Sequence, residues 1–162
     1  MVLPYLISTA KISECTNYRY HLHRLWDASK PNLMYIGLNP SKADANQDDP
    51  TIRRCVGFAR DNGFGGLYMM NLFAFRSIKP KNLLTAQDPV GPENDWWLDS
   101  IQAECTMVLF CWGAHKMVTH NGRDRDVEKM FPRALCLGRT AGGFPRHPLF
   151  VSGLTQLEKY QQ

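Results

Sequence analysis

Three polar side chains stand where apolar segments of this sequence end or turn back. Asn39 directly follows the apolar segment 33–38, and Asn71 closes the segment 67–71. His147 lies in a later loop, between two prolines. In open α/β sheets, ligand sites form beyond the carboxyl ends of the strands. We therefore expect Asn39, Asn71 and His147 to form one composite site.

These residue types suit the hydrolysis of the bond between a nucleobase and its sugar. In that reaction the sugar carbon becomes cationic and the departing base anionic, so the site needs an oriented water, an amide that reads the base edge and a donor to the base oxygen. Asn39 can orient the water, Asn71 can read the base, and His147 can stabilise the leaving base. Asn39 and His147 are thus the candidate catalytic residues.

The segments that would position these residues alternate between strands and helices. Buried strands are expected near 33–38, 67–71, 107–112 and 134–137. Between the first two, Asp49 can cap a helix that Pro50 begins and Gly63 ends, with apolar side chains at helical spacing. This alternation predicts an α/β fold, a single three-layer α/β/α domain over residues 1–162 with a central, mainly parallel sheet.

The segment 18–26 alternates bulky apolar and polar side chains. This is the period of a strand with one face in water, and His21 and His23 fall on the polar face.

Composition places the chain among ordinary water-soluble proteins. Its 162 residues are 44% hydrophobic and 21% charged, and no apolar run is long enough to cross a membrane. The first residues lack the basic region of a signal peptide. Five scattered cysteines without metal-binding spacing indicate reduced thiols in a cytoplasmic protein, so we expect neither a metal ion nor another cofactor. Nothing in the composition indicates an oligomeric state.

The net charge of +4 is concentrated in two stretches, 53–81 and 133–147. Clustered arginines beside a site suit a partner that carries phosphates, so DNA or a nucleotide is the expected partner. The arginines expected to bind it are Arg53, Arg54, Arg76 and Arg146.

Four short motifs together resemble those of the uracil-DNA glycosylase superfamily, over roughly residues 33–150. They are Gly37-Leu38-Asn39-Pro40-Ser41, Leu67 to Asn71, Val108 to His115, and Arg146-His147-Pro148-Leu149. The resemblance implies a glycosylase-like fold, with a flipped base bound by Asn71 and enclosed by the His-Pro loop. It also implies that Gly37, Leu38, Pro40, Ser41 and Phe73 bind substrate and that Leu149 or Phe150 can wedge the strand.

A second resemblance covers most of the chain and is closer. Asp49 to Cys55, Asn71 to Arg76, Asp88 to Asp95 and Pro145 to Leu149 are similar to a bacterial and phage family known only as a domain of unknown function.

Two other functions fit parts of the sequence. Asp44, Asp48 and Asp49 could hold Mg²⁺ in a metal-dependent nucleic-acid phosphoesterase or nuclease. At the position of Asn39, the best-known glycosylases carry a carboxylate. An asparagine side chain cannot act as a base, so Asn39 also suits a non-catalytic module that binds nucleic acid or a nucleotide.

Overall fold

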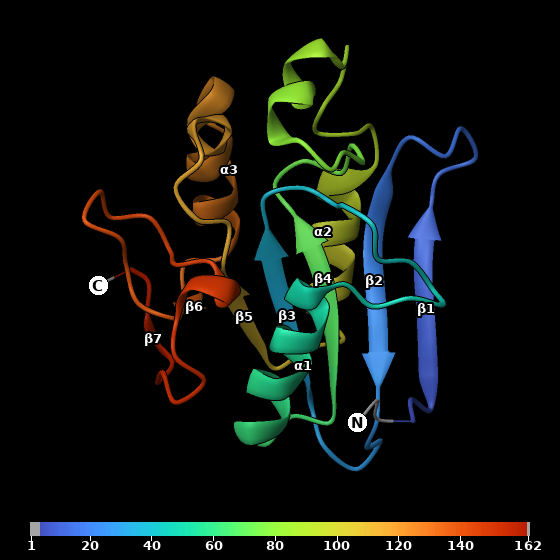
Figure 1. Cartoon of the computed structure of the whole chain (residues 1–162), viewed down its shortest axis with the longest axis vertical. Helices are drawn as coiled ribbons and strands as arrows, with labels where there is room; N and C mark the ends of the chain where they lie inside the picture. Colours follow the sequence, from blue (N-terminus) through green and yellow to red (C-terminus); the bar gives the residue numbers. More distant parts are fainter. Residues whose placement is uncertain (1–3, 162) are drawn as a thin grey trace.

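The computed structural model describes residues 4–161 and shows one seven-stranded sheet flanked by helices (Figure 1). The expectation about a signal peptide therefore concerns residues that lie partly outside the described range. Along the sheet, the order is β1-β2-β4-β3-β5-β6-β7. The strands are β1 (Ile7–Ile12), β2 (Arg19–Leu25), β3 (Asn32–Gly37), β4 (Gly66–Asn71), β5 (Met107–Phe110), β6 (Leu135–Cys136) and β7 (Glu158–Lys159).

The four strands expected from sequence form the parallel centre of the sheet. β3 pairs in parallel with β4 and β5, and β5 with β6. The sheet as a whole is mixed, however, because β1 and β2 on one side and β7 on the other are antiparallel to their neighbours. The prediction of a mainly parallel sheet was therefore too simple: antiparallel outer strands extend a parallel core.

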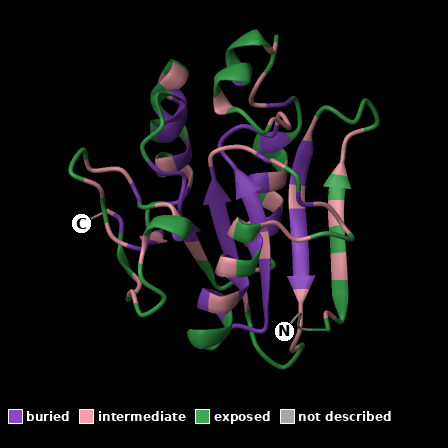
Figure 2. Cartoon of the chain, viewed as in Figure 1, coloured by how far each residue is buried: buried purple, intermediate pink, exposed green. Residues whose placement is uncertain are grey.

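Helices cover both faces of the sheet, as the alternation of buried side chains along β3 requires. Leu33 and Tyr35 pack in one apolar cluster with α1 (Pro50–Asp61), whereas Met34 and Ile36 pack on the opposite face with α2 (Asn94–Gln102) and α3 (Arg123–Met130). Figure 2 shows the central strands as buried, whereas the outer strand β1 alternates between exposed and intermediate residues. Within residues 4–161, no helix has the length and apolar character needed to cross a membrane.

Short 3-10 helices shape the loops at the upper end of the sheet in Figure 1 and beside β6. These are η1 (Pro80–Thr85), η2 (Lys116–Gly122) and η3 (Pro148–Phe150).

Helix α1 begins and ends close to where its sequence signals predict. The carboxylate of Asp49 accepts a hydrogen bond from the backbone N–H of Ile52 at 2.9 Å, and Pro50 occupies the first turn. The helix ends at Asp61, two residues before Gly63, which has a φ of 85°. Because of this cap, the N-terminus of α1 is fixed beside the loop that follows β3.

Strand β2 does not have the wet face that its alternation predicts. It lies between β1 and β4, and the histidine face is covered by aromatic side chains. The ring of His23 stacks on Tyr68 with centroids 4.0 Å apart, and His21 meets the edge of Trp97 from α2 at 4.9 Å. Burial lowers the pKa of His21 to about 4, with the neighbouring charges of His23 and Lys11 adding to the effect.

Candidate functional site

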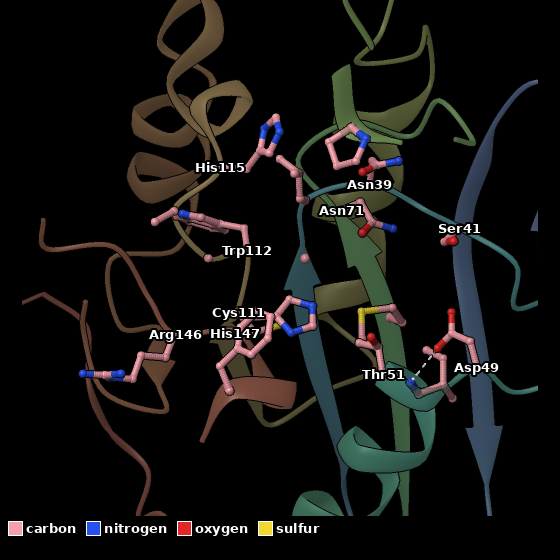
Figure 3. A pocket seen from close by; sticks show the side chains of 18 of the residues that line it. Asn39, Ser41, Asp49, Thr51, Asn71, Cys111, Trp112, His115, Arg146 and His147 are labelled. Atoms are coloured by element: carbon pink, nitrogen blue, oxygen red, sulfur yellow. Dashed lines mark hydrogen bonds between the residues drawn. The ribbon is translucent and has the colours of Figure 1, made fainter. Parts of the chain in front are cut away.

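A cavity of about 530 Å³ opens beyond the carboxyl ends of β3, β4 and β5 (Figure 3). This is the place where an open α/β sheet is expected to bind ligands. Of the residues predicted from sequence to form the site, seven line this cavity: Gly37, Leu38, Asn39, Ser41, Asn71, Arg146 and His147. The three residues of the predicted composite site thus lie around one space, and Figure 3 shows Asn39 and Asn71 on one side of it, with His147 near its middle.

Asn71 presents a buried polar group that no described residue satisfies. Its side chain is only 3% exposed, and its Nδ2 has no hydrogen-bond partner among the described residues. Gly37, on the neighbouring strand, leaves space for this amide, because a Cβ at that position would lie 3.0 Å from Asn71 Oδ1. A buried donor without an acceptor is costly, so the Asn71 amide is suited to a ligand that brings an acceptor.

Asn39 holds the loop that follows β3. Its Nδ2 donates to the backbone carbonyls of Pro40 at 3.0 Å and of Ser77 at 2.8 Å. Both partners are acceptors, so the NH₂ group must face them, and Oδ1 is the atom that remains for other contacts. Asn39 can therefore offer an acceptor to a water or a ligand, but it has no proton donor to spare.

His147 is held as a neutral imidazole with a defined tautomer. Its Nδ1 accepts a hydrogen bond from the backbone N–H of Leu149 at 3.2 Å, so in the neutral ring the proton resides on Nε2. Burial lowers the pKa of His147, and the charge of Asp49 opposes this shift only in part. The ring thus keeps an Nε2–H donor at neutral pH. His115, also on the cavity wall, accepts from Met117 N through Nδ1 at 3.1 Å in the same way.

The loop that carries His147 is fastened to helix α1 and to the turn after β5. Arg54 donates through Nε to the carbonyl of Pro148 at 3.2 Å and through Nη2 to the carbonyl of Val151. On the other side, the N–H of Gly113 donates to Pro145 O at 2.9 Å. Gly113 has a φ of 74°, a conformation that favours glycine, and its α-carbon faces the Cβ of His147.

Six residues predicted to bind substrate do not line this cavity. Phe73 lies in the core and is 1% exposed. The backbone carbonyl of Pro40 accepts a hydrogen bond from Asn39 Nδ2. The guanidinium of Arg53 donates to Asp48 O at 3.2 Å, and that of Arg76 to Thr16 O at 3.1 Å. Arg54 donates a hydrogen bond to the loop that carries His147. In that loop, Phe150 lines the cavity, whereas Leu149 does not. Charge and position in sequence could not distinguish arginines that anchor loops from arginines that face a ligand.

Residues that the sequence prediction missed complete the wall. Asp49 and Thr51 come from the N-terminus of α1, and Arg19 comes from the first residue of β2. Because β2 runs antiparallel to β4, its beginning lies at the same edge of the sheet as the end of β4. The sequence carries the signal for the helix cap, but not the strand order that brings Arg19 here.

The acidic loop does not gather its carboxylates. Asp48 pairs with Arg24 at 2.9 Å and accepts from the Tyr5 hydroxyl at 2.6 Å, and Asp44 accepts from the backbone of Asn46 and Gln47. Within residues 4–161, no cluster of three or more His, Cys, Asp or Glu side chains has a metal-binding arrangement. The Mg²⁺ site considered for Asp44, Asp48 and Asp49 therefore has no counterpart in the described geometry.

Comparison with known proteins gives one match. Residues 19–149 match the model of a family described as Protein of unknown function (DUF1643). No curated protein and no solved structure matches the chain.

Proposed function

This chain belongs to the DUF1643 family, and we propose that it hydrolyses the N-glycosidic bond of a nucleobase in DNA or a nucleotide. The proposal rests on the cavity itself and on the resemblance of its motifs to those of uracil-DNA glycosylases. The observation that carries it is the Asn71 amide, which is 3% exposed and whose Nδ2 has no hydrogen-bond partner within residues 4–161. Nucleobase edges supply carbonyl and ring-nitrogen acceptors that such a buried donor requires.

In the proposed reaction, His147 stabilises the leaving base. Cleavage puts negative charge on the base, and a neutral imidazole that donates from Nε2 can bind the developing oxyanion without giving up its proton. The hydrogen bond from Leu149 N to Nδ1 fixes this donor, and burial keeps the ring neutral by lowering its pKa. Because the charge on the base appears only in the transition state, His147 contributes more to the rate than to binding.

Water activation is assigned to two residues instead of one. Asn39 can orient a water through Oδ1, but it cannot take a proton. Among the lining residues that the structure describes, Asp49 is the one that carries a carboxylate. Its Oδ1 accepts from Ile52 N, which leaves Oδ2 to act as general base. The Asp49 carboxylate thus supplies the function that Asn39 lacks.

The test is release of free base, measured by mass spectrometry, from nucleotides and DNA that carry natural and modified nucleobases. Asn71→Asp keeps the shape of the side chain but replaces the donor with an acceptor, so we expect release to fall at least 100-fold with folding retained. Asn17→Asp makes the same change in an exposed turn and serves as the matched control. Asp49→Asn keeps the helix cap, since asparagine caps as well as aspartate, and removes the general base.

Two results would count against hydrolysis. If no substrate in the panel releases base while the wild-type protein binds nucleotides tightly, the protein is a binding module, as the amide at position 39 also allows. If Asn71→Asp and Asp49→Asn release base as fast as the wild-type protein, the activity resides elsewhere.

A further inference from the structure

Three arginines are almost fully buried in the described part of the chain, and one of them differs from the other two. Arg24 is 1% exposed and pairs with Asp48 at 2.9 Å, and Arg123 is 4% exposed and pairs with Asp95 at 2.7 Å. Arg19 is 3% exposed, yet it forms no ion pair with a described residue. A buried cation without a carboxylate partner is unfavourable unless another anion reaches it.

The hydrogen bonds of Arg19 leave most of its donors unused. Nη1 donates to the backbone carbonyl of Ala43 at 2.9 Å, whereas Nε is buried and has no partner among the described residues. The Nη1 bond ties the guanidinium to the loop after β3, so it is held in place rather than free to turn towards solvent. Arg19 also lines the large cavity, so its side chain borders the space that a ligand would fill.

Other groups that favour an anion lie on the same wall. Ser41 and Thr51 contribute hydroxyls, and Thr51 stands in the first turn of the twelve-residue helix α1, whose positive end faces the cavity. Figure 3 shows Ser41, Asp49 and Thr51 together on one side of the cavity, apart from His115 and Arg146. Asp49 is the opposing charge: its Oδ1 accepts from the N–H of Ile52, but the carboxylate keeps its negative charge, which Arg19 and the helix N-terminus must offset for an anion to bind.

We propose that Arg19, Ser41 and Thr51 form a subsite for a phosphate group of the substrate, so that the cavity takes a phosphorylated nucleoside. A guanidinium, hydroxyls and a helix N-terminus are the groups that proteins use for phosphate. The subsite lies next to Asn71, because β2 and β4 are neighbouring strands. Base and phosphate would thus be bound on adjacent parts of one wall. This inference rests on the proposed function for the identity of the base, but the phosphate subsite can be tested without it.

The test compares calorimetric binding of matched nucleosides and nucleoside 5′-monophosphates, with inorganic phosphate as a separate probe. For the wild-type protein we expect the monophosphate to bind at least 10-fold more tightly than the nucleoside. Arg19→Met should abolish that difference and leave nucleoside affinity within about 2-fold. Arg60→Met removes an exposed positive charge at the far end of α1 and is the matched control, expected to retain the difference.

Arg19 is buried, so a second variant guards against misfolding. Ser41→Ala combined with Thr51→Val leaves Arg19 in place and should reduce the phosphate advantage several-fold. Equal affinities for nucleoside and monophosphate in the wild-type protein would overturn the proposal, as would an undiminished advantage in both variants. Phosphate-dependent binding without base release would uphold the subsite and refute hydrolysis.

A further arm separates the two sources of phosphate. If a single-stranded oligonucleotide shows the same dependence on Arg19 as the mononucleotide, the subsite reads the phosphate of a nucleic-acid strand. If only the mononucleotide shows it, the substrate is a free nucleotide.

Discussion

Replacing Arg54 by alanine distinguishes an arginine that binds nucleic acid from one that positions the loop carrying His147. If Arg54 contacted a phosphate, Arg54→Ala would weaken binding uniformly and reduce the slope of log affinity against log salt by about 1. In the structure, its guanidinium is instead committed to the carbonyls of Pro148 and Val151, and it lies over the ring of Phe58 at 5.5 Å. We therefore expect the salt slope to stay unchanged.

The expected loss of stability follows from these contacts. Each hydrogen bond to a charged group contributes about 1.5–3 kcal/mol, so the two bonds give at most about 3–6 kcal/mol. Water can replace part of this because Arg54 is only half-buried, so about 2–3 kcal/mol remains. For a domain of this size, that corresponds to a Tm lower by roughly 5–10 °C. Base release should fall more than binding, since His147 is the residue left loose.

Urea unfolding, thermal melting and salt-dependent binding measure these effects. Arg53→Ala is the control: the neighbouring arginine makes one bond of 3.2 Å to Asp48 O and is exposed, so stability should change by less than about 0.5 kcal/mol. The reasoning fails if Arg54→Ala leaves stability intact while flattening the salt dependence.

The remaining predictions concern three other positions. Asn39→Asp places a carboxylate against the carbonyls of Pro40 and Ser77, which in the wild-type protein accept hydrogen bonds from Nδ2 of Asn39. We therefore expect the free energy of unfolding to fall by about 2–4 kcal/mol, with no gain in base release. A variant that is as stable as the wild-type protein and releases base faster would refute this role of Asn39. Gly37→Ala puts a Cβ 3.0 Å from Asn71 Oδ1 and should cost about 1 kcal/mol while lowering base release roughly 10-fold in the mass-spectrometric assay; unchanged release would mean that the amide needs no such space. His21 has its pKa lowered to about 4, so the unfolded chain takes up the proton first as the pH falls. Stability should be fully present above pH 6.5 and decline by about 2–3 kcal/mol towards pH 4, and urea unfolding of His21→Gln should show a smaller decline.

Local sequence signals determined the central strands of this protein, the start of α1 and three residues of the candidate site. Runs of apolar residues placed the four central strands within two residues at every boundary, because a strand buried on both faces must be apolar throughout. Asp49 and Pro50 located the start of α1, since capping depends only on neighbouring residues. Asn39 and Asn71 were recognised because each stands at the end of an apolar segment, and His147 because of its loop between two prolines; the structure brings all three to one cavity.

The tertiary structure alone decided what each arginine and histidine does. Arg19 and Arg54 are the same residue type, yet their roles differ. Arg19 lines the cavity, and its Nε has no partner among the described residues, whereas Arg54 holds a loop about 95 residues away in sequence. The antiparallel pairing of β2 with β4 placed Arg19 at the site, and the cover by Tyr68 and Trp97 buried the histidines of β2. Strand order and the partners of long side chains depend on contacts between distant segments, which no local pattern encodes.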